Sequence, residues 1–301
     1  MEHLDIALGA LVMPEHPGPR GADVWRHIED VGFRHAWTFD HLSWRTLRDQ
    51  PWFDTMTTLA AAAVRTDRIG LGTLVCTPNF RHPVLLAKSA MSIDHLSGGR
   101  LLLGLGSGAP GPDSEALGGQ RLDARERAAR FEEFVRLTDL LLRSPVSTHR
   151  GAFYEADDVR MVPGCLQRPR VPFAVAARGP RGMRLAAEHA DVWVCNGPPD
   201  RTESNAEEAV FADLARQVDD LRIACHHRGR PFGDLRRLVY VSRSLPRVAE
   251  SAARLVDVLG RCAELGFTDA VVAFPRRDGI FAGSPHHLEH VAAELATTQR
   301  S

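Results

Sequence analysis

The stretch from Ile69 to Pro83, IGLGTLVCTPNFRHP, begins as an apolar strand and ends in a cluster of chemically active side chains. A thiol, a hydroxyl, an amide, a guanidinium and an imidazole follow one another over residues 76–82. A turn alone would need only a Gly, Asn or Pro. The cluster therefore predicts that this strand ends in a functional site. No His partner for Cys76 is visible in the sequence, so we interpret Cys76 as part of a pocket wall.

A second group lies in the sequence TFDHLSW, where Asp40 and His41 are followed by Trp44. Histidine gains and loses a proton near neutral pH, so His41 could donate or accept a proton at a substrate heteroatom. Trp44 could wall a pocket or stack on a ring. The residues alone leave open that His41 is a structural histidine at the start of a loop.

A third group is the turn RGPRGM, which follows an apolar run and opens a helical pattern. Pro180 falls in the first helical turn, where its missing N–H is harmless. Free N–H groups at a helix N-terminus attract phosphate, and Arg178 or Arg181 could add positive charge. The alternative is a plain strand-to-helix connection with two solvated arginines.

Apolar runs and helical patterns alternate along the whole chain. The predicted strands are Asp5–Leu11, His35–Phe39, Ile69–Cys76, Leu101–Leu105, Pro172–Ala176, Asp191–Cys195, Leu235–Ser242 and Thr268–Phe274. The predicted helices are Asp23–Val31, Phe53–Arg65, Pro83–Leu96, Ala124–Arg143, Pro180–Glu188, Asn205–His227, Val248–Leu265 and Pro285–Ala296. This alternation predicts a (β/α)8 TIM barrel with its active site at the carboxyl ends of the strands.

The rival architecture is a doubly wound sheet, which needs a GxGxxG turn after the first strand. The first strand here leads to GALVMPEHPGPRG, and the GLGSGAPG sequence comes only after the fourth. We therefore expect one domain over residues 1–301. Its long connections, Gly106–Asp123 and Ser144–Val171, are predicted to be loops on the barrel rim.

The composition excludes several classes of protein. The 301 residues carry 37 basic and 38 acidic side chains, which does not suit a nucleic-acid partner. No apolar run reaches the roughly 20 residues that span a bilayer, and no secretion signal is recognised, so we expect a cytoplasmic protein. The five cysteines lack CxxC spacing and the paired histidines lack HExxH, so no metal site is predicted.

The sequence resembles the bacterial luciferase-like flavin and deazaflavin oxidoreductases. The resemblance rests on Leu71–Gly108, on Thr38–Trp44 and on Val175–Trp193, and extends in a weaker form over nearly the whole chain. The words DH, CTPNFR and AARGP are similar to the branch that uses coenzyme F420, an 8-hydroxy-5-deazaflavin, rather than FMN. The resemblance therefore implies a (β/α)8 enzyme that transfers hydride to or from F420.

The resemblance also implies roles for individual residues. His41 would be a proton relay, and Trp44 beside it would be the second catalytic residue. A non-proline cis peptide between Leu74 and Val75 would form a bulge behind the deazaflavin ring. The implied cofactor contacts come from Asp40, Leu74, Val75, Thr77, Gly106, Ser107, Ala176, Ala177, Gly179, Pro180 and Arg181.

One position departs from the sugar-phosphate dehydrogenases of this branch. Their strand-four loop carries an acidic proton donor where this chain has Ala109, and the spacing does not decide whether Asp113 or Glu115 replaces it. This absence favours reduction of a C=C or C=N bond over sugar-phosphate oxidation. The alternatives are an FMN-dependent monooxygenase using O2 and a non-catalytic flavin-binding barrel. Relatives often pair through outer helices, so a homodimer or higher oligomer is expected.

Overall fold

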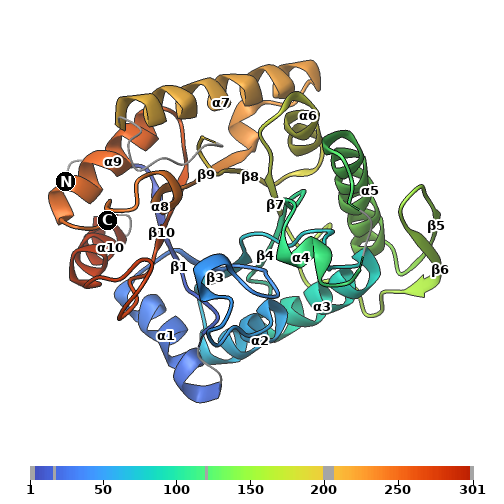
Figure 1. Ribbon diagram of the computed structural model, residues 1–301, viewed down its shortest axis with the longest axis horizontal. Helices are drawn as coiled ribbons and strands as arrows, with labels where there is room; N and C mark the ends of the chain where they lie inside the picture. The colour runs from blue at the N-terminus through green and yellow to red at the C-terminus, as the bar shows by residue number, and fades with distance from the viewer. Residues whose placement is uncertain (1–3, 16–17, 119–120, 199–206, 299–301) are drawn as a thin grey trace. The chain divides into compact units, whose positions relative to one another are not determined.

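The computed structural model describes residues 4–15, 18–118, 121–198 and 207–298. Strands and helices alternate along these ranges (Figure 1). Within them, the parallel strands close into a barrel in the order β1-β10-β9-β8-β7-β4-β3-β2, which confirms the predicted (β/α)8 fold. The barrel strands are β1 (Ala7–Leu11), β2 (His35–Thr38), β3 (Gly70–Thr73), β4 (Leu101–Leu105), β7 (Phe173–Ala176), β8 (Val192–Cys195), β9 (Arg236–Tyr240) and β10 (Asp269–Ala273).

The longer helices follow the predicted pattern closely. They are α1 (Gly18–Val31), α2 (Thr55–Arg65), α3 (Pro83–Leu96), α5 (Ala124–Arg143), α6 (Pro180–His189), α7 (Glu207–His227), α9 (Ala252–Glu264) and α10 (His286–Thr298). Local signals set several of their ends. Asp54 caps α2 by accepting from the Thr57 N–H, and Asp123 and Glu126 form a capping box at the start of α5.

The chain divides into two compact units, which we describe separately. The first unit comprises Met1–Met13, His27–Trp37 and Ala177–Ser301. At the amino ends of its strands, buried Asp269 accepts hydrogen bonds from the His35 ring and from Arg236. Trp193 stacks on Phe267 with ring centroids 5.9 Å apart. The prediction of a single domain stays a prediction.

The second unit comprises Pro14–Arg26 and Thr38–Ala176, and contains the stretch from Ile69 to Pro83. Strand β3 ends at Thr73, earlier than predicted, and the Leu74–Val75 peptide bond that follows is cis. The cis bond itself was predicted and is confirmed. The chain then pairs with β4 again, where the Cys76 N–H donates to the Gly104 carbonyl at 2.8 Å.

Several short elements were not predicted. An antiparallel hairpin, β5 (Val146–Arg150) and β6 (Glu155–Arg160), lies beside α5 in a connection that was expected to be a loop (Figure 1). Most of its residues are polar and exposed, so it lacks the apolar alternation of a core strand. Helix α4 (Pro112–Glu115) lies in the other expected loop, and α8 (Val241–Ser244) begins where the seventh strand was expected to continue.

Across the described ranges, no helix combines the length and apolar character needed to cross a membrane. The same residues contain no group of three or more His, Cys, Asp or Glu side chains placed to hold a metal ion. All five cysteines are free and buried.

Candidate active site

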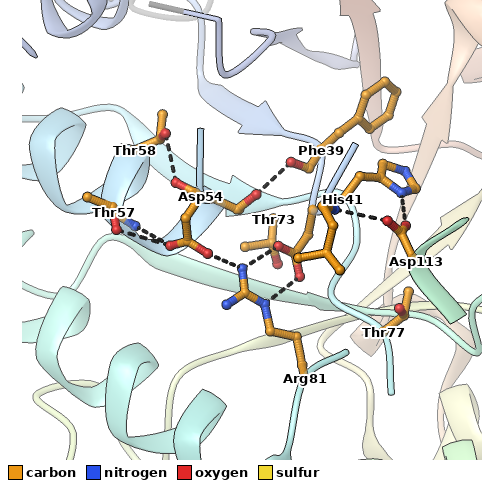
Figure 2. A network of polar contacts seen from close by, with 12 residues as sticks. Phe39, His41, Asp54, Thr57, Thr58, Thr73, Thr77, Arg81 and Asp113 are labelled. Atoms are coloured by element: carbon orange, nitrogen blue, oxygen red, sulfur yellow. Dashed lines mark hydrogen bonds and ion pairs between the residues drawn. The ribbon is translucent and has the colours of Figure 1, made fainter. Parts of the chain in front are cut away.

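A buried charge network lies directly after β2 in the second unit. The Asp40 side chain is fully buried, and both of its carboxylate oxygens accept from Arg81, at 3.0 Å from Nε and 2.6 Å from a terminal nitrogen. The same terminal nitrogen donates to Asp54 at 2.5 Å. Figure 2 shows the Arg81 guanidinium reaching the Asp54 carboxylate. Arg81 therefore ties the end of β2 to the cap of α2.

The network shifts the pKa values of Arg81 and Asp54 and of the neighbouring Cys76. Burial opposes the charge on Arg81, but hydrogen bonds and the charge of Asp40 outweigh it and raise the Arg81 pKa. Burial raises the pKa of Asp54, whereas the Thr57 N–H and Arg81 lower it, and the net pKa lies below the ordinary value of 3.8. Burial, then the charge of Asp40, raise the pKa of Cys76 well above its ordinary value. Cys76 is therefore a neutral thiol at neutral pH, which suits a pocket wall better than a nucleophile.

His41 is held by a carboxylate from a different loop. Its Nδ1 lies 2.5 Å from Asp113 Oδ2 (Figure 2). The other Asp113 oxygen accepts from the Leu42 N–H at 2.9 Å. Since a carboxylate only accepts, this contact places the proton on Nδ1 and leaves Nε2 for another partner. The His41 side chain is 32% exposed, so part of the ring is open to solvent.

Trp44 belongs to an aromatic stack rather than to an open wall. Its ring stacks between Phe39, at 5.2 Å, and Trp52, at 6.1 Å, and the residue is 5% exposed. Trp52 donates its ring N–H to the His41 carbonyl at 2.8 Å. The stack supports the backbone of His41, and the predicted catalytic role of Trp44 stays a prediction.

The ends of β3, β4 and β7 meet through small residues. A Cβ atom at Gly106 would lie 2.4 Å from Val75 Cγ2 and 3.8 Å from the Ala176 Cβ, so only glycine fits against Val75. Leu74 and Thr77 are buried, Val75 and Ala176 are partly exposed, and Ser107 is exposed. The buried Thr38 hydroxyl at the end of β2 has no hydrogen-bond partner among the described residues.

The predicted phosphate-binding turn lies in the first unit. Gly179 is the N-cap of α6, Pro180 is its first residue, and a Cβ at Gly179 would meet nothing within 4 Å. Gly179, Pro180 and Arg181 are exposed, and the Ala177 carbonyl accepts from the Trp193 ring N–H at 2.9 Å. Arg178 is paired with Asp213 at 3.0 Å. The first residues of α6 are therefore exposed.

The structure thus places the predicted residues in two groups. Those of the second unit share the ends of β2, β3, β4 and β7: Asp40, His41, Trp44, Leu74, Val75, Thr77, Gly106, Ser107 and Ala176. Those of the first unit are consecutive with β7 along the chain: Ala177, Gly179, Pro180 and Arg181. Sequence reasoning assigned no role to Arg81 or Asp54, and it named Asp113 without a partner. The one sequence signal for Asp113 was its position as an acidic residue in the connection after β4.

Comparison with known proteins decides the family. A family model described as luciferase-like monooxygenase matches residues 9–300. The chain belongs to this family. The resemblance found in the sequence is therefore confirmed.

Relatives in this family carry names of two kinds. The chain is 32% identical over 265 residues to 4-hydroxyprotoasukamycin monooxygenase of Streptomyces nodosus subsp. asukaensis, covering 84% of this chain and 67% of that protein. It is also 32% identical over 232 residues to F420-dependent glucose-6-phosphate dehydrogenase of Amycolatopsis mediterranei (strain U-32), covering 71% and 68%. Among solved structures, the coenzyme F420-dependent tetrahydromethanopterin reductase of Methanopyrus kandleri shares the fold, with a TM-score of 0.73, 17% identity and 97% coverage of each chain.

Proposed function

We propose that this protein is an F420-dependent oxidoreductase that transfers a hydride between the deazaflavin and a small organic substrate. The observation that carries the proposal is His41, which is oriented through Nδ1 by Asp113 and keeps Nε2 for a ligand at the end of a barrel strand. Active sites of (β/α)8 enzymes lie at these strand ends. Relatives named F420-dependent dehydrogenases support the choice of cofactor.

The residues present fit the two chemically different parts of such a cofactor. In the second unit, Gly106 lets the end of β4 lie against Val75, and the small residue Ala176 ends β7. The Thr38 hydroxyl, which has no partner among the described residues, could bond to a polar edge of the ring. In the first unit, the exposed N-terminus of α6 could hold a phosphate. When bound, the deazaflavin would act as the two-electron carrier that gives or accepts the hydride.

His41 would move the proton that balances the hydride. Its Nε2 would donate to, or accept from, the substrate heteroatom, while Asp113 fixes the tautomer and the ring orientation. The stack of Phe39, Trp44 and Trp52 would hold the His41 backbone in place. Such positioning is worth a large part of a catalytic barrier.

We propose reduction of a C=C or C=N bond as the reaction type. Its support is Ala109, which stands where the sugar-phosphate dehydrogenases carry an acid. The Ala109 carbonyl accepts from the Asn79 amide at 2.9 Å, and the acid that follows, Asp113, serves His41 instead. At position 109 the loop after β4 therefore has no carboxylic acid to donate a proton. The proton relay would be His41, which Asp113 of that connection orients.

A second candidate is an FMN-dependent monooxygenase that uses O2. It is favoured by the relative from Streptomyces nodosus subsp. asukaensis, which is named as a monooxygenase and covers 84% of this chain. The same His41 and strand-end residues could serve either cofactor, so the cofactor decides between the two reactions.

An anaerobic turnover screen tests the proposal. Reduced F420 is mixed with the protein and with compounds that carry an activated C=C or C=N bond, and its oxidation is followed by absorbance. Substrate-dependent oxidation without O2 supports the proposal. Turnover that requires FMN and O2, with none on F420, would replace it with the monooxygenase.

We also propose a homodimer or higher homo-oligomer. Its support is exposed apolar surface on two helices in contact, where Val64 of α2 and Leu85 of α3 are 68% and 69% exposed. Light scattering on the purified protein measures the oligomeric state. The cytoplasmic location stays a prediction.

A further inference from the structure

A cavity of about 250 Å³ lies in the second unit, beside the loop that carries Asp113. Helix α4, the start of α5, the loop after β3 and the turn of the hairpin all contribute to it. Its lining combines apolar and basic side chains: Asn79, Pro110, Ser114, Glu115, Leu117, Arg121, Leu122, Arg127, Arg130 and Phe153.

The arginines of this cavity are not neutralised by the protein. Among the described residues, no carboxylate forms an ion pair with Arg121, Arg127 or Arg130, and one carboxylate, Glu115, shares the lining. Arg127 donates to the Leu122 carbonyl at 3.0 Å. Arg130 donates to Asn79 Oδ1 at 2.8 Å, while its buried Nε has no partner in the part of the chain that the structure describes.

The acidic residues nearest along α5 are bound elsewhere. Glu126 accepts from the Asp123 N–H in the capping box, and Glu132 pairs with Arg136. Glu133 accepts from the backbone N–H groups of residues 152–154 and contacts His149. Among the described residues, Glu115 is therefore the one carboxylate that lines the cavity with the three arginines, and the lining keeps a net positive charge.

Asn79 fixes Arg130 relative to the loop after β4. Its amide nitrogen donates to the Ala109 carbonyl and its oxygen accepts from Arg130. A Cβ at Gly108 would lie 2.6 Å from the Asn79 nitrogen, so glycine leaves the room for this contact. Arg130 is thus held in one position, as a binding residue must be.

We propose that this cavity binds the oxyanion of a small organic acid, with arginine donors on its carboxylate or phosphate and apolar residues on its body. Guanidinium groups bind such oxyanions with charge-assisted hydrogen bonds. Pro110, Leu117, Leu122 and Phe153 supply the apolar surface. The same helix, α4, carries Asp113 toward His41 and Ser114 toward the cavity, so the acid would belong to the substrate. That last step rests on the proposed function, whereas binding of the acid does not.

The test is calorimetric titration of the full chain, without cofactor, at low ionic strength. The probes are phenylacetate and phenyl phosphate, and the neutral control is 2-phenylethanol, which has a similar body without the charge. We expect saturable binding of at least one anion, and binding of the alcohol at least about tenfold weaker. Equal binding of the anions and the alcohol, or no binding of either anion, would overturn the proposal.

Arg130→Gln should weaken the anion about ten- to a hundredfold, as expected for loss of a charged hydrogen bond. The matched control is Arg136→Gln on the same helix, because Arg136 is 50% exposed and pairs with Glu132. Arg127→Gln is the second variant, and it keeps the test decisive if Arg130→Gln does not fold. An equal loss in Arg136→Gln would show a nonspecific charge effect and overturn the site. Since no cofactor is present, this result is independent of whether F420 binds.

Discussion

Asp40 and Asp113 each bind a basic side chain in the second unit, but the partner of Asp40 is enclosed and the partner of Asp113 is partly exposed. Asp40 is fully buried, and its partner Arg81 is 19% exposed and also bound to Asp54. Asp113 is 13% exposed, and its partner His41 is 32% exposed with Nε2 uncommitted among the described residues. The first pairing uses the charge to join elements, whereas the second uses it to orient a side chain toward a ligand.

One strand end can thus serve both the fold and the chemistry. Asp40 and His41 are neighbours in the sequence, yet their partners come from the loops after β3 and β4. A carboxylate whose partner is enclosed contributes to stability, while one whose partner stays reachable can contribute to turnover. The two pairings should therefore respond differently to substitution.

The largest effect should be on turnover, at the partly exposed His41–Asp113 pair. His41→Gln should lower turnover by roughly 10²- to 10⁴-fold, because it removes the proton relay. Asp113→Asn should lower it less, since the amide still accepts from the Leu42 N–H but no longer fixes the His41 tautomer. Both variants should keep the wild-type free energy of unfolding within about 1 kcal/mol, because the His41 side chain is partly exposed.

Anaerobic kinetics on the substrate found in the turnover screen measure this prediction. The matched control is His95→Gln, because His95 is exposed and its ring bonds to the Gly164 carbonyl, away from the His41–Asp113 pair. Wild-type turnover by His41→Gln would show that another residue relays the proton, and would contradict the role assigned to the His41–Asp113 pair.

The next effect should be on stability, at the buried Asp40–Arg81 pair. Arg81→Met should lower the free energy of unfolding by about 3–5 kcal/mol, because it leaves Asp40 charged and buried without a partner. Adding Asp40→Asn to Arg81→Met should restore part of the loss, since no charge then stays buried. Urea unfolding of both variants measures the two values.

The control for Arg81 is Arg26→Met, which breaks a surface pair with Asp67 where the side chains are 38% and 70% exposed. That change should cost less than about 1 kcal/mol. If Arg81→Met and Arg26→Met cost the same, the buried network does not hold the fold.

The smallest effect is a pH dependence of stability at Asp54. Its pKa is lower in the folded protein than the ordinary value of 3.8, so its charged form stabilises the fold above that pH. This stabilisation is lost as the pH falls through the folded pKa. Asp54→Asn keeps a side chain that can cap α2 but removes the charge, so it should cost only about 0.5 kcal/mol at pH 7, because Asp54 is 45% exposed.

Unfolding curves of the wild type and Asp54→Asn at pH 7 and near pH 3 measure this difference, which should shrink at the lower pH. Asp67→Asn, which removes an exposed surface pair, should show no measurable difference at pH 7. A difference that grows with acid would mean that the sign assigned to Asp54 is wrong.

Much of the fold could be predicted because the barrel strands are short apolar runs bounded by polar residues. The sequence placed Asp40 and His41 at a strand end, and the resemblance placed the cis bond at Leu74–Val75. The partner of His41 could not be predicted, because Asp113 lies 71 residues from Leu42 and reaches both residues only through the fold. The same holds for Arg81 and Asp40, which are 41 residues apart.

The unpredicted elements have a common physical reason. The β5–β6 hairpin and helix α4 are short and largely exposed, so burial imposes no periodic pattern on their residues. These elements nevertheless bring Phe153 and Ser114 to the arginine-lined cavity. Sequence periodicity identifies the residues that build the core, and it does not identify those that form the rim.

The measurement that tests the central claim most directly is an anaerobic equilibrium titration of the purified protein, without cofactor, with oxidised F420 and separately with FMN. Absorbance and intrinsic fluorescence follow the binding. F420-dependent hydride transfer predicts tight, saturable binding of F420 and much weaker binding of FMN. Preference for FMN would contradict the claim and favour the O2-dependent reaction, and binding of neither cofactor would contradict both.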